Sequence, residues 1–566
     1  MIRLFETHKI RKTEELSGKM WDFTPLAPEQ PQETQKVLVP GCVETYPGFG
    51  NYRGWCAYET AFEAEGNVRL EFKGVSHYAK VYVDEELVAE HYGSYTPFDV
   101  VCRNLSAGTH ALKVLTDNDF RDEYALDMPN DYMSYGGISR GVALENIGEA
   151  YIKYVHATPL GETDGAWLAD VEIVCENVTG NACEGSIRLN IADTVVETET
   201  KTLLPGETVW ELKGVRVPGV KAWSMESPAL YQMEAVLVQD GKETDDWIDR
   251  IGFRTVRVEG KRVLLNGRPI RIKGFCRHED HPQYGCALPA QAIAYDLQLI
   301  KDMGGNSVRT THYPNDELFL DLCDEMGILV WEENHARGFG SEQMANPYFE
   351  PQCEQVIREM ITCHYNHPSI YIWGILNECA SESEVGRKCY QAQYELIRSL
   401  DTSRPCSSAS CKFNKDICQD LPDVCSWNMY PYWYEEKTAT QMAGETMRWA
   451  EEHGGSGKPF LITEIGAGGI YAFRDQAHDV WSEDLQAEIL RKQLTEVAEL
   501  EDCMGLYIWQ FCDVRVSRTW WAIRRPKSRN NKGVVDEYRR PKMAYHVVKE
   551  IFGKLPDYWD GETAES

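Results

Sequence analysis

The first part of the chain, up to about residue 258, alternates short apolar and polar runs in the pattern of half-buried β-strands. Gly, Asn and Asp residues of the kind that form turns separate these runs, which include 68–72, 79–83, 110–116, 167–175, 186–192, 207–217 and 231–239. A stretch with Pro and two Gly residues at 156–166, HATPLGETDGA, suggests a boundary. We therefore predict two all-β sandwich domains, a jelly-roll-like one over residues 1–160 and an immunoglobulin-like one over 161–258.

After Gly260 the pattern changes to apolar strands that alternate with helical stretches. The predicted strands are 271–275, 307–311, 328–332, 370–376, 405–409, 424–429, 460–463 and 505–511. Eight strands with this alternation are typical of a (β/α)8 TIM barrel, which we predict over residues 259–566. Because such barrels carry their chemistry at the C-terminal ends of the strands, candidate residues are sought there.

Composition and charge argue against some classes of partner. The formal net charge is −31, which argues against nucleic acid as a partner, because phosphate contacts need clustered Lys and Arg. No apolar run approaches the length of roughly 20 residues that spans a bilayer, so no membrane partner is expected. The 18 cysteines are scattered and form no C-x-x-C pairs. We therefore expect buried free thiols and a cytoplasmic location.

Two of the predicted barrel strands end in an isolated glutamate after a hydrophobic run. These are IYIWGILNE, which ends at Glu378, and PFLITE, which ends at Glu464. A carboxylate is costly inside a dry strand but useful at the mouth of a barrel. The alternative for each is a structural ion pair. Two carboxyls on facing strands predict glycoside hydrolysis, in which one group protonates the leaving oxygen and the other attacks the anomeric carbon.

With these motifs, and with FCRHEDHPQYG and SVRTTHYPND, the chain resembles glycoside hydrolase family 2 over nearly its whole length, and within it the bacterial β-glucuronidase type. The resemblance implies a sugar-binding first sandwich and a retaining β-glucuronidase that forms a covalent glycosyl-enzyme intermediate. In that family the acid/base falls on Glu378 and the nucleophile on Glu464. It also implies a glucuronide or oligosaccharide as substrate, no cofactor or metal, and a homo-oligomer, either dimer or tetramer.

The resemblance also implies a set of residues that contact the sugar: Asn377, Tyr430, Tyr434, Trp509, His278 and Asp131. Asn377 would bind the 2-hydroxyl, and Tyr430 would hold the nucleophile. Trp509 is equally well explained as a buried core indole. The H-x-x-H spacing of His278 and His281 offers weak support for a metal site, and we predict none.

One stretch reverses the charge of this acidic chain. Residues 515–542 contain ten basic and two acidic residues. A run of this kind is often only a solvated face, but this one follows the eighth strand and so lies at the barrel mouth. Within it, Asn530 and Lys532 match the Asn-x-Lys motif that, by the resemblance, distinguishes uronidases from galactosidases and mannosidases. A Lys ammonium and an Asn amide would form charge-assisted hydrogen bonds with a sugar carboxylate.

Arg337 follows the third strand in ILVWEENHARG. One interpretation is a rim arginine paired with Glu332 or Glu333. The other is a second cation in the pocket, which would allow β-galacturonides to be accepted. Two further hypotheses stay open from the sequence: a β-galactosidase or β-mannosidase of the same family, and a non-catalytic carbohydrate-binding protein.

Overall fold

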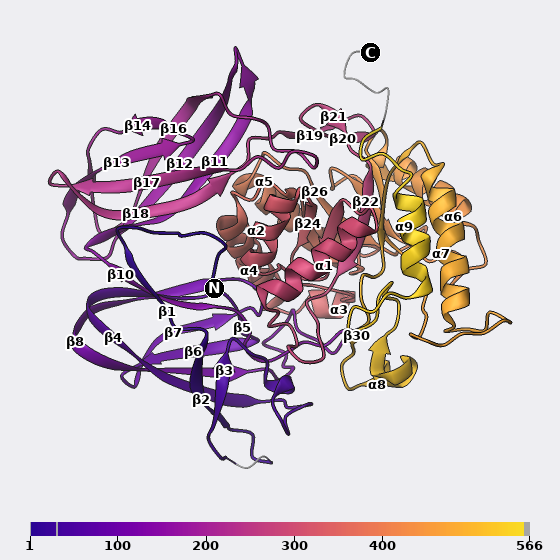
Figure 1. The fold of residues 1–566 in the computed structure, drawn as a ribbon, viewed down its shortest axis with the longest axis horizontal. Coiled ribbons are helices and arrows are strands. Elements are labelled where there is room, and N and C mark those ends of the chain that lie inside the picture. Colours follow the sequence, from indigo (N-terminus) through magenta and orange to yellow (C-terminus); the bar gives the residue numbers. More distant parts are fainter. Residues whose placement is uncertain (1, 30–31, 560–566) are drawn as a thin grey trace.

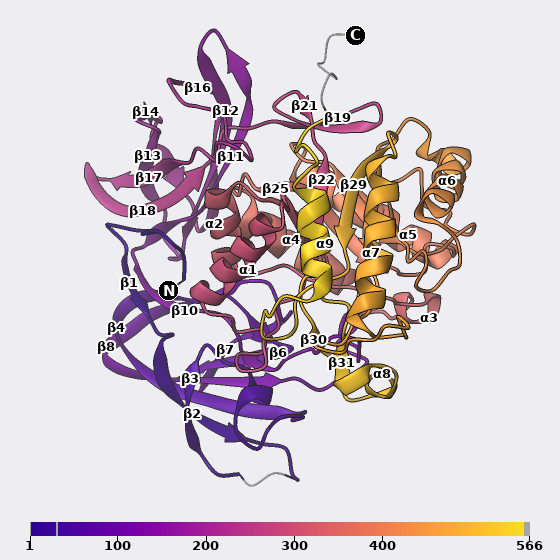
Figure 2. The same ribbon diagram turned by 45° about the vertical axis from the view of Figure 1, so that its right-hand side comes forward.

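The structure is a computed structural model that describes residues 2–29 and 32–559. Two β-sandwiches lie on one side of a barrel, and the first sandwich also reaches beneath it (Figure 1). Figure 2 shows the same arrangement after a turn of 45°. The predicted fold class, two all-β domains followed by a (β/α)8 barrel, is confirmed.

The first sandwich is built on one large antiparallel sheet in the order β1-β10-β4-β8-β6-β7, with β2 paired to β4 and β3 paired to β2. Its core contains Trp21, Tyr58 and Phe72, all fully buried. Its elements are β1 (Lys12–Glu15), β2 (Lys19–Pro25), β3 (Gln35–Val39), η1 (Val43–Thr45), β4 (Trp55–Phe72), β5 (Val75–Ser76), β6 (Tyr78–Val83), β7 (Glu86–Tyr92), β8 (Phe98–Asp117), β9 (Gly137–Ile138) and β10 (Val142–Ile147).

The second sandwich packs the sheet β11-β12-β16 against the sheet β14-β13-β17-β18. Its strands are β11 (Ala150–Thr163), β12 (Ala166–Asn177), β13 (Cys183–Ile191), β14 (Thr194–Glu197), β15 (Lys201–Leu203), β16 (Gly206–Pro218), β17 (Tyr231–Gln239) and β18 (Lys242–Ile251). The boundary expected at residue 160 falls inside β11, which pairs with β12 along its length. Pro159 and Gly161, which suggested a linker, lie instead at a register shift, since a bulge accommodates them within a strand.

A small sheet of β19 (Val256–Glu259), β20 (Arg262–Leu265) and β21 (Arg268–Pro269) precedes the barrel. Its apolar residues Val263 and Leu265 share a core with Trp331 and Tyr371 from inside the barrel. This sheet therefore covers the apolar end of the barrel, and the opposite end is left for polar groups.

The barrel is a closed ring of parallel strands from β22 to β29, and all eight predicted strands are confirmed. They are β22 (Ile272–Arg277), β23 (Ser307–Thr310), β24 (Leu329–Glu333), β25 (Ile370–Asn377), β26 (Cys406–Ser410), β27 (Cys425–Asn428), β28 (Phe460–Ile465) and β29 (Cys503–Ile508). Nearly all residues of these strands are buried, as expected for strands covered on both faces. One residue of β26 and one of β29 are partly exposed.

Helices cover the outside of the barrel. They are α1 (Ala290–Asp302), α2 (Glu317–Met326), α3 (Ser341–Met344), α4 (Phe349–His364), α5 (Glu384–Leu400), α6 (Ala439–Ala450), η2 (Glu451–Gly455), α7 (Glu483–Ala498), α8 (Trp520–Arg524), η3 (Pro526–Ser528) and α9 (Met543–Phe552). Several begin where a side chain accepts a backbone N–H, as Asp316, Ser383 and Ser482 do. After β29, the short pair β30 (Val514–Arg515) and β31 (Arg529–Asn530) brackets α8.

The first sandwich is joined to the barrel mouth by its loop 118–136 and the residues around it. The Tyr95 ring stacks on the Tyr313 ring with centroids 3.9 Å apart. Arg140 Nη2 donates to Glu279 Oε2 at 2.8 Å, with both side chains buried. This loop therefore lies close enough to add residues to a site at the strand ends.

The sequence predicts no membrane-spanning segment, and it predicts that the cysteines are free thiols. Among the described residues, no helix combines the length and apolar character needed to cross a bilayer. All 18 cysteines are free thiols, and most are buried. Cys42 of the first sandwich and Cys286 of the barrel bring their sulfurs to 3.5 Å.

Candidate active site

Glu378 follows directly after β25, at the C-terminal end of that strand. Its backbone is in the left-handed region, with φ 55°, a strained conformation that clusters at functional sites. Its Oε1 accepts a hydrogen bond from Asn428 Nδ2 at 3.0 Å, and its Oε2 lies 3.6 Å from Arg337 Nη2. The side chain is 20% exposed, so this carboxyl can exchange protons with solvent.

Glu464 lies within β28 and is 3% exposed. Tyr430 Oη donates to its Oε2 at 2.5 Å, and Arg309 Nη1 donates to its Oε1 at 3.1 Å. Burial raises the pKa of Glu464 to about 8, together with the nearby Glu378, while Arg309 and the Tyr430 hydrogen bond oppose this shift.

Glu378 is one of the groups that raise the pKa of Glu464, so the two carboxyls repel each other when both are ionised. The repulsion from Glu378 acts on Glu464 only while Glu378 is ionised. A proton on Glu378 removes that repulsion, and two donors already hold the Glu464 carboxylate. The hydrogen bonds of the two carboxyls therefore differ, since Glu464 accepts from two donors and Glu378 from one neutral amide.

Arg309 and Asn428 connect the two carboxyls to Asn377, and neither residue was predicted from the sequence. Asn377 Oδ1 accepts from Arg309 Nη2 at 2.8 Å and from Asn428 Nδ2 at 3.0 Å. Glu333 accepts two hydrogen bonds from Arg309, at 2.8 and 3.1 Å. The available signal was a charged residue, Arg309, inside a fully buried barrel strand, which is rare unless the charge is paired.

These contacts orient Asn377 so that its amide nitrogen is free for a ligand. Its Oδ1 is used by the network, whereas its buried Nδ2 has no hydrogen-bond partner in the protein. Buried polar atoms are nearly always paired, so an unpaired one beside two carboxyls indicates a polar ligand.

An aromatic wall lies beside the pair. The Trp509 indole, which follows β29, stacks on the His312 ring with centroids 5.1 Å apart, and His278 meets Trp509 edge-on at 5.5 Å. His278 Nδ1 lies 3.2 Å from Tyr313 Oη, and its Nε2 is buried without a partner in the protein. Trp509 is therefore a buried indole, with 2% of its surface exposed, and it also lies beside the candidate site.

The neighbours of His278 in the sequence are engaged in structural contacts. Glu279 accepts from Arg140, and Asp280 accepts from Tyr135 Oη at 2.8 Å. The acidic side chains of this motif therefore secure the sandwich to the barrel.

Lys532 is 2% exposed and, among the described residues, no carboxylate oxygen lies within 4.0 Å of its Nζ. Its Nζ lies 5.3 Å from the Tyr434 ring centroid and 5.8 Å from that of Tyr430. Burial and the neighbouring Arg525 lower the pKa of Lys532. A buried ammonium without a carboxylate partner is costly, so this position suits an anionic ligand.

Asp131 reaches this region from the first sandwich and is 3% exposed. Its Oδ2 accepts from Asn530 Nδ2 at 3.1 Å and from Arg525 Nη2 at 2.8 Å. Burial raises the pKa of Asp131, but the charges of Arg337, Arg525 and Lys532 outweigh it and hold the pKa well below its usual range. The oxygens Asp131 Oδ1 and Asn530 Oδ1 are both buried without a hydrogen-bond partner in the protein.

Arg337 does not pair with Glu332 or Glu333. Its Nη1 donates to Asn130 Oδ1 at 2.9 Å, and its Nη2 lies 3.3 Å from Asp131 Oδ1. The two glutamates have other partners, since His364 contacts Glu332 and Arg309 contacts Glu333. Arg337 therefore lies between Asp131 of the first sandwich and Glu378 of the barrel and contacts both.

Tyr434 stands at the rim, with 59% of its side chain exposed, and its ring meets the Tyr430 ring edge-on at 5.2 Å. Burial of its hydroxyl end raises the pKa, but the charges of Lys532 and Arg525 outweigh this and lower the pKa of Tyr434 to about 8. Every sugar-contact residue expected from the sequence thus lies at the C-terminal ends of the strands, around Glu378 and Glu464.

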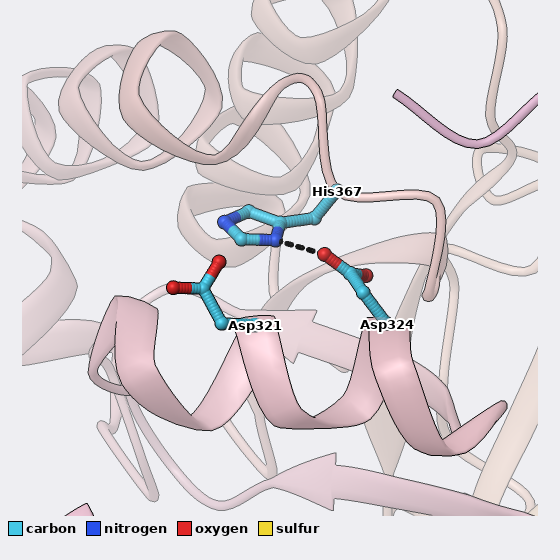
Figure 3. Close-up of side chains that lie close together, drawn as sticks. All are labelled: Asp321, Asp324 and His367. Atoms are coloured by element: carbon cyan, nitrogen blue, oxygen red, sulfur yellow. Dashed lines mark hydrogen bonds and ion pairs between the residues drawn. The ribbon is translucent and has the colours of Figure 1, made fainter. Parts of the chain in front are cut away.

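A separate cluster of possible metal ligands, Asp321, Asp324 and His367, lies on the outer side of the barrel (Figure 3). Its carboxylates already have protein partners. Arg3 donates two hydrogen bonds to Asp321, and Asp324 accepts from His367 Nδ1 at 2.6 Å. The cluster is therefore explained as a charge network that ties the N-terminal segment to helix α2.

Comparisons with known proteins agree with this geometry. The chain matches the glycosyl hydrolases family 2 sugar-binding domain over residues 35–147, the family 2 domain over 150–254 and the family 2 TIM barrel domain over 256–556. It is 26% identical to a β-glucuronidase of Streptococcus agalactiae, over 97% of this chain and 98% of that protein.

Solved structures give a similar result. A GH2 β-galacturonidase from Eisenbergiella tayi bound to galacturonate is 55% identical, covers 99% of this chain and all of its own, and superposes with a TM-score of 0.95. A β-D-glucuronidase of Dictyoglomus thermophilum is 26% identical over 99% of this chain and 100% of its own, with a TM-score of 0.83. The chain belongs to glycosyl hydrolase family 2.

Proposed function

We propose that this enzyme is a retaining β-hexuronidase that releases uronic acids from β-linked glycosides. The observation that carries the proposal is Lys532, a buried ammonium with no carboxylate partner among the described residues, beside Asn530 and near the catalytic pair. A sugar carboxylate supplies the missing charge. Support comes from relatives named as a β-galacturonidase and a β-glucuronidase.

The proposed reaction has two steps. In the first, Glu464 attacks the anomeric carbon while the Glu378 proton passes to the glycosidic oxygen, so that the bond to the leaving alcohol breaks. In the second, water attacks the same carbon, Glu378 takes its proton, and the ester bond to Glu464 breaks. The products are the free uronic acid, with its anomeric configuration retained, and the alcohol.

Asn377 is proposed to bind the sugar 2-hydroxyl through its unpaired Nδ2, a contact that strengthens in the transition state. Trp509 and His278 are proposed to form the floor of the sugar site. Asp131, held ionised by its cations, is proposed to accept a hydrogen bond from a ring hydroxyl through its free Oδ1.

The test is to offer aryl β-glucuronide, β-galacturonide, β-galactoside and β-mannoside in parallel. We expect both uronides to be hydrolysed and the neutral glycosides to react at least 100-fold more slowly, because a neutral sugar leaves Lys532 unpaired, and each tenfold corresponds to about 1.4 kcal/mol. Hydrolysis of the neutral sugars alone would favour a galactosidase or mannosidase, and no hydrolysis of any of them would favour a binding protein.

The Lys532→Met variant sharpens this test. Losing one partner of a buried charge pair costs about 2–5 kcal/mol, so kcat/KM for the uronides should fall by at least about 30-fold. Activity on neutral glycosides should not fall. Lys554→Met, which removes an exposed lysine far from the site, is the control. Equal losses on acidic and neutral sugars would show that Lys532 does not bind the carboxylate.

We also propose that β-galacturonide is accepted alongside β-glucuronide. The supporting observation is the position of Arg337 between Asp131 and Glu378, which adds a second cation to the pocket. The relative at 55% identity is bound to galacturonate. In the Arg337→Ala variant, we expect kcat/KM to fall further for galacturonide than for glucuronide. If both fall by the same factor, Arg337 does not select the configuration at C4.

A further inference from the structure

A second group of cations lies outside the sugar pocket, on the segment that carries helix α8. Residues 514–535 contain seven basic residues and no acidic one, in a protein of net charge −31. Three of them, Arg518, Arg524 and Lys527, are exposed. Among the described residues, none of these three has a carboxylate within 4.0 Å. Their charge is therefore not neutralised by a carboxylate of the described residues.

Helix α8 also exposes apolar surface. Trp520 is 51% exposed and Ile523 is 88% exposed, although large apolar side chains are normally covered. The Trp520 ring stacks on the Trp521 ring with centroids 3.9 Å apart, and the Arg524 guanidinium lies 4.7 Å from the Trp520 ring centroid. An aromatic face bordered by cations is a platform for a ring that carries negative charge.

This platform lies next to the part of the site from which the leaving group departs. Arg337 lies 3.6 Å from Glu378, the proposed proton donor to the leaving oxygen. The same guanidinium lies 5.7 Å from the Trp521 ring centroid. Trp521 in turn stacks on Trp520, which is exposed to solvent. Hydrogen bonds from Ser517 to Tyr132 and from Arg515 to Asn51 hold the segment against the first sandwich.

We propose that Trp520, Arg518, Arg524 and Lys527 form an aglycone subsite for an anionic ring, such as a second acidic sugar. The inference rests on the proposed uronidase function and names the chemistry of the leaving group. Repulsion from the acidic protein would otherwise disfavour a substrate with two negative charges. A local positive surface beside the mouth reverses the sign of the field where the aglycone binds.

Three β-uronides distinguish this subsite: a 4-nitrophenyl uronide with a neutral aglycone, a 3-carboxyphenyl uronide, and a disaccharide of two uronic acids. We expect KM for the two anionic-aglycone substrates to be at least tenfold lower than for the neutral one at low salt. This advantage should shrink as ionic strength rises, because exposed charges are screened over about 10 Å at 0.1 M. A preference for only one anionic substrate would identify which ring the platform binds.

The decisive variant is Arg518→Gln/Arg524→Gln/Lys527→Gln. It should raise KM for the anionic-aglycone substrates about tenfold and leave KM for the nitrophenyl uronide and all kcat values within about twofold. Arg103→Gln/Lys221→Gln/Lys242→Gln is the matched control, because it removes three exposed charges from the sandwiches. Trp520→Ala should raise KM for all three substrates.

The outcomes separate the two proposals. If the nitrophenyl uronide is hydrolysed but neither anionic aglycone is preferred, or if the triple variant and its control behave alike, the subsite proposal is wrong and the uronidase proposal stands. If no uronide is hydrolysed, the proposed function itself fails.

Discussion

Glu464 and Glu378 lie at the C-terminal ends of two strands of one barrel, yet their surroundings differ. Glu464 is 3% exposed and accepts from Tyr430 and Arg309, one donor on each oxygen. Glu378 is 20% exposed at its side chain, has left-handed backbone geometry and accepts one hydrogen bond from a neutral amide. The two surroundings suit the two different roles that we propose for these glutamates. Donors on both oxygens stabilise an anion, whereas partial exposure lets a carboxyl gain and lose a proton.

The largest expected effect comes from removing the nucleophile. Glu464→Ala should lower kcat/KM for an aryl uronide by at least about 10⁴-fold, or about 5 kcal/mol of transition-state stabilisation, since no other group can form the glycosyl ester. Added azide should restore turnover and give a product of inverted configuration, detectable by NMR. Retained activity without azide would show that Glu464 is not the nucleophile.

Glu378→Gln should have a smaller effect that depends on the leaving group. General acid catalysis contributes about 10²–10⁴-fold, and a nitrophenolate needs little help from an acid. We therefore expect a modest loss with nitrophenyl uronide and a much larger loss with an alkyl uronide, measured as kcat/KM across a series of aglycones. A loss that is independent of the leaving group would mean that Glu378 does not donate the proton.

The smallest expected effect tests the hydrogen bond on Glu464. This bond lowers the pKa of Glu464, so Tyr430→Phe should raise that pKa and leave less of the ionised nucleophile at low pH. The acid limb of the pH profile of kcat/KM should move to higher pH by about one unit, since a hydrogen bond to a charged group is worth about 1.5–3 kcal/mol and one pKa unit is about 1.4 kcal/mol.

Tyr434→Phe is the matched control for this shift. Tyr434 lies beside Tyr430, but its contacts are with Lys532 and Arg525 and not with Glu464. Its replacement should change KM and leave the acid limb in place. If both variants shift the limb equally, the Tyr430 contact does not set the ionisation of Glu464.

The sequence predicted the fold well because hydrophobic periodicity reports burial directly. All eight barrel strands were found, since buried parallel strands form continuous apolar runs. The boundary at residue 160 was less reliable, because Pro159 and Gly161 form a bulge within β11 as readily as they form a linker. Pro and Gly residues indicate the local geometry of the backbone, but they do not show which strand pairs with that segment.

The candidate site was predictable wherever a residue lay at a strand end. Glu378 and Glu464 stood out for that reason. Lys532 stood out because it lies in the basic stretch after the eighth strand and matches the Asn-x-Lys motif. Arg309 and Asn428 were missed, although they hold both carboxyls and Asn377, because their roles depend on which strands become neighbours.

The sequence by itself determined the two sandwiches, the barrel, the two strand-end glutamates and the basic stretch after the eighth strand. Only the tertiary structure decided how charges were paired. Arg337 was placed against Asp131, 206 positions away in the chain, and not against the nearby Glu332 or Glu333. Lys532 was left buried without a carboxylate partner among the described residues. The reason is that burial patterns are encoded along the chain, whereas electrostatic pairing depends on distances between segments that only folding brings together.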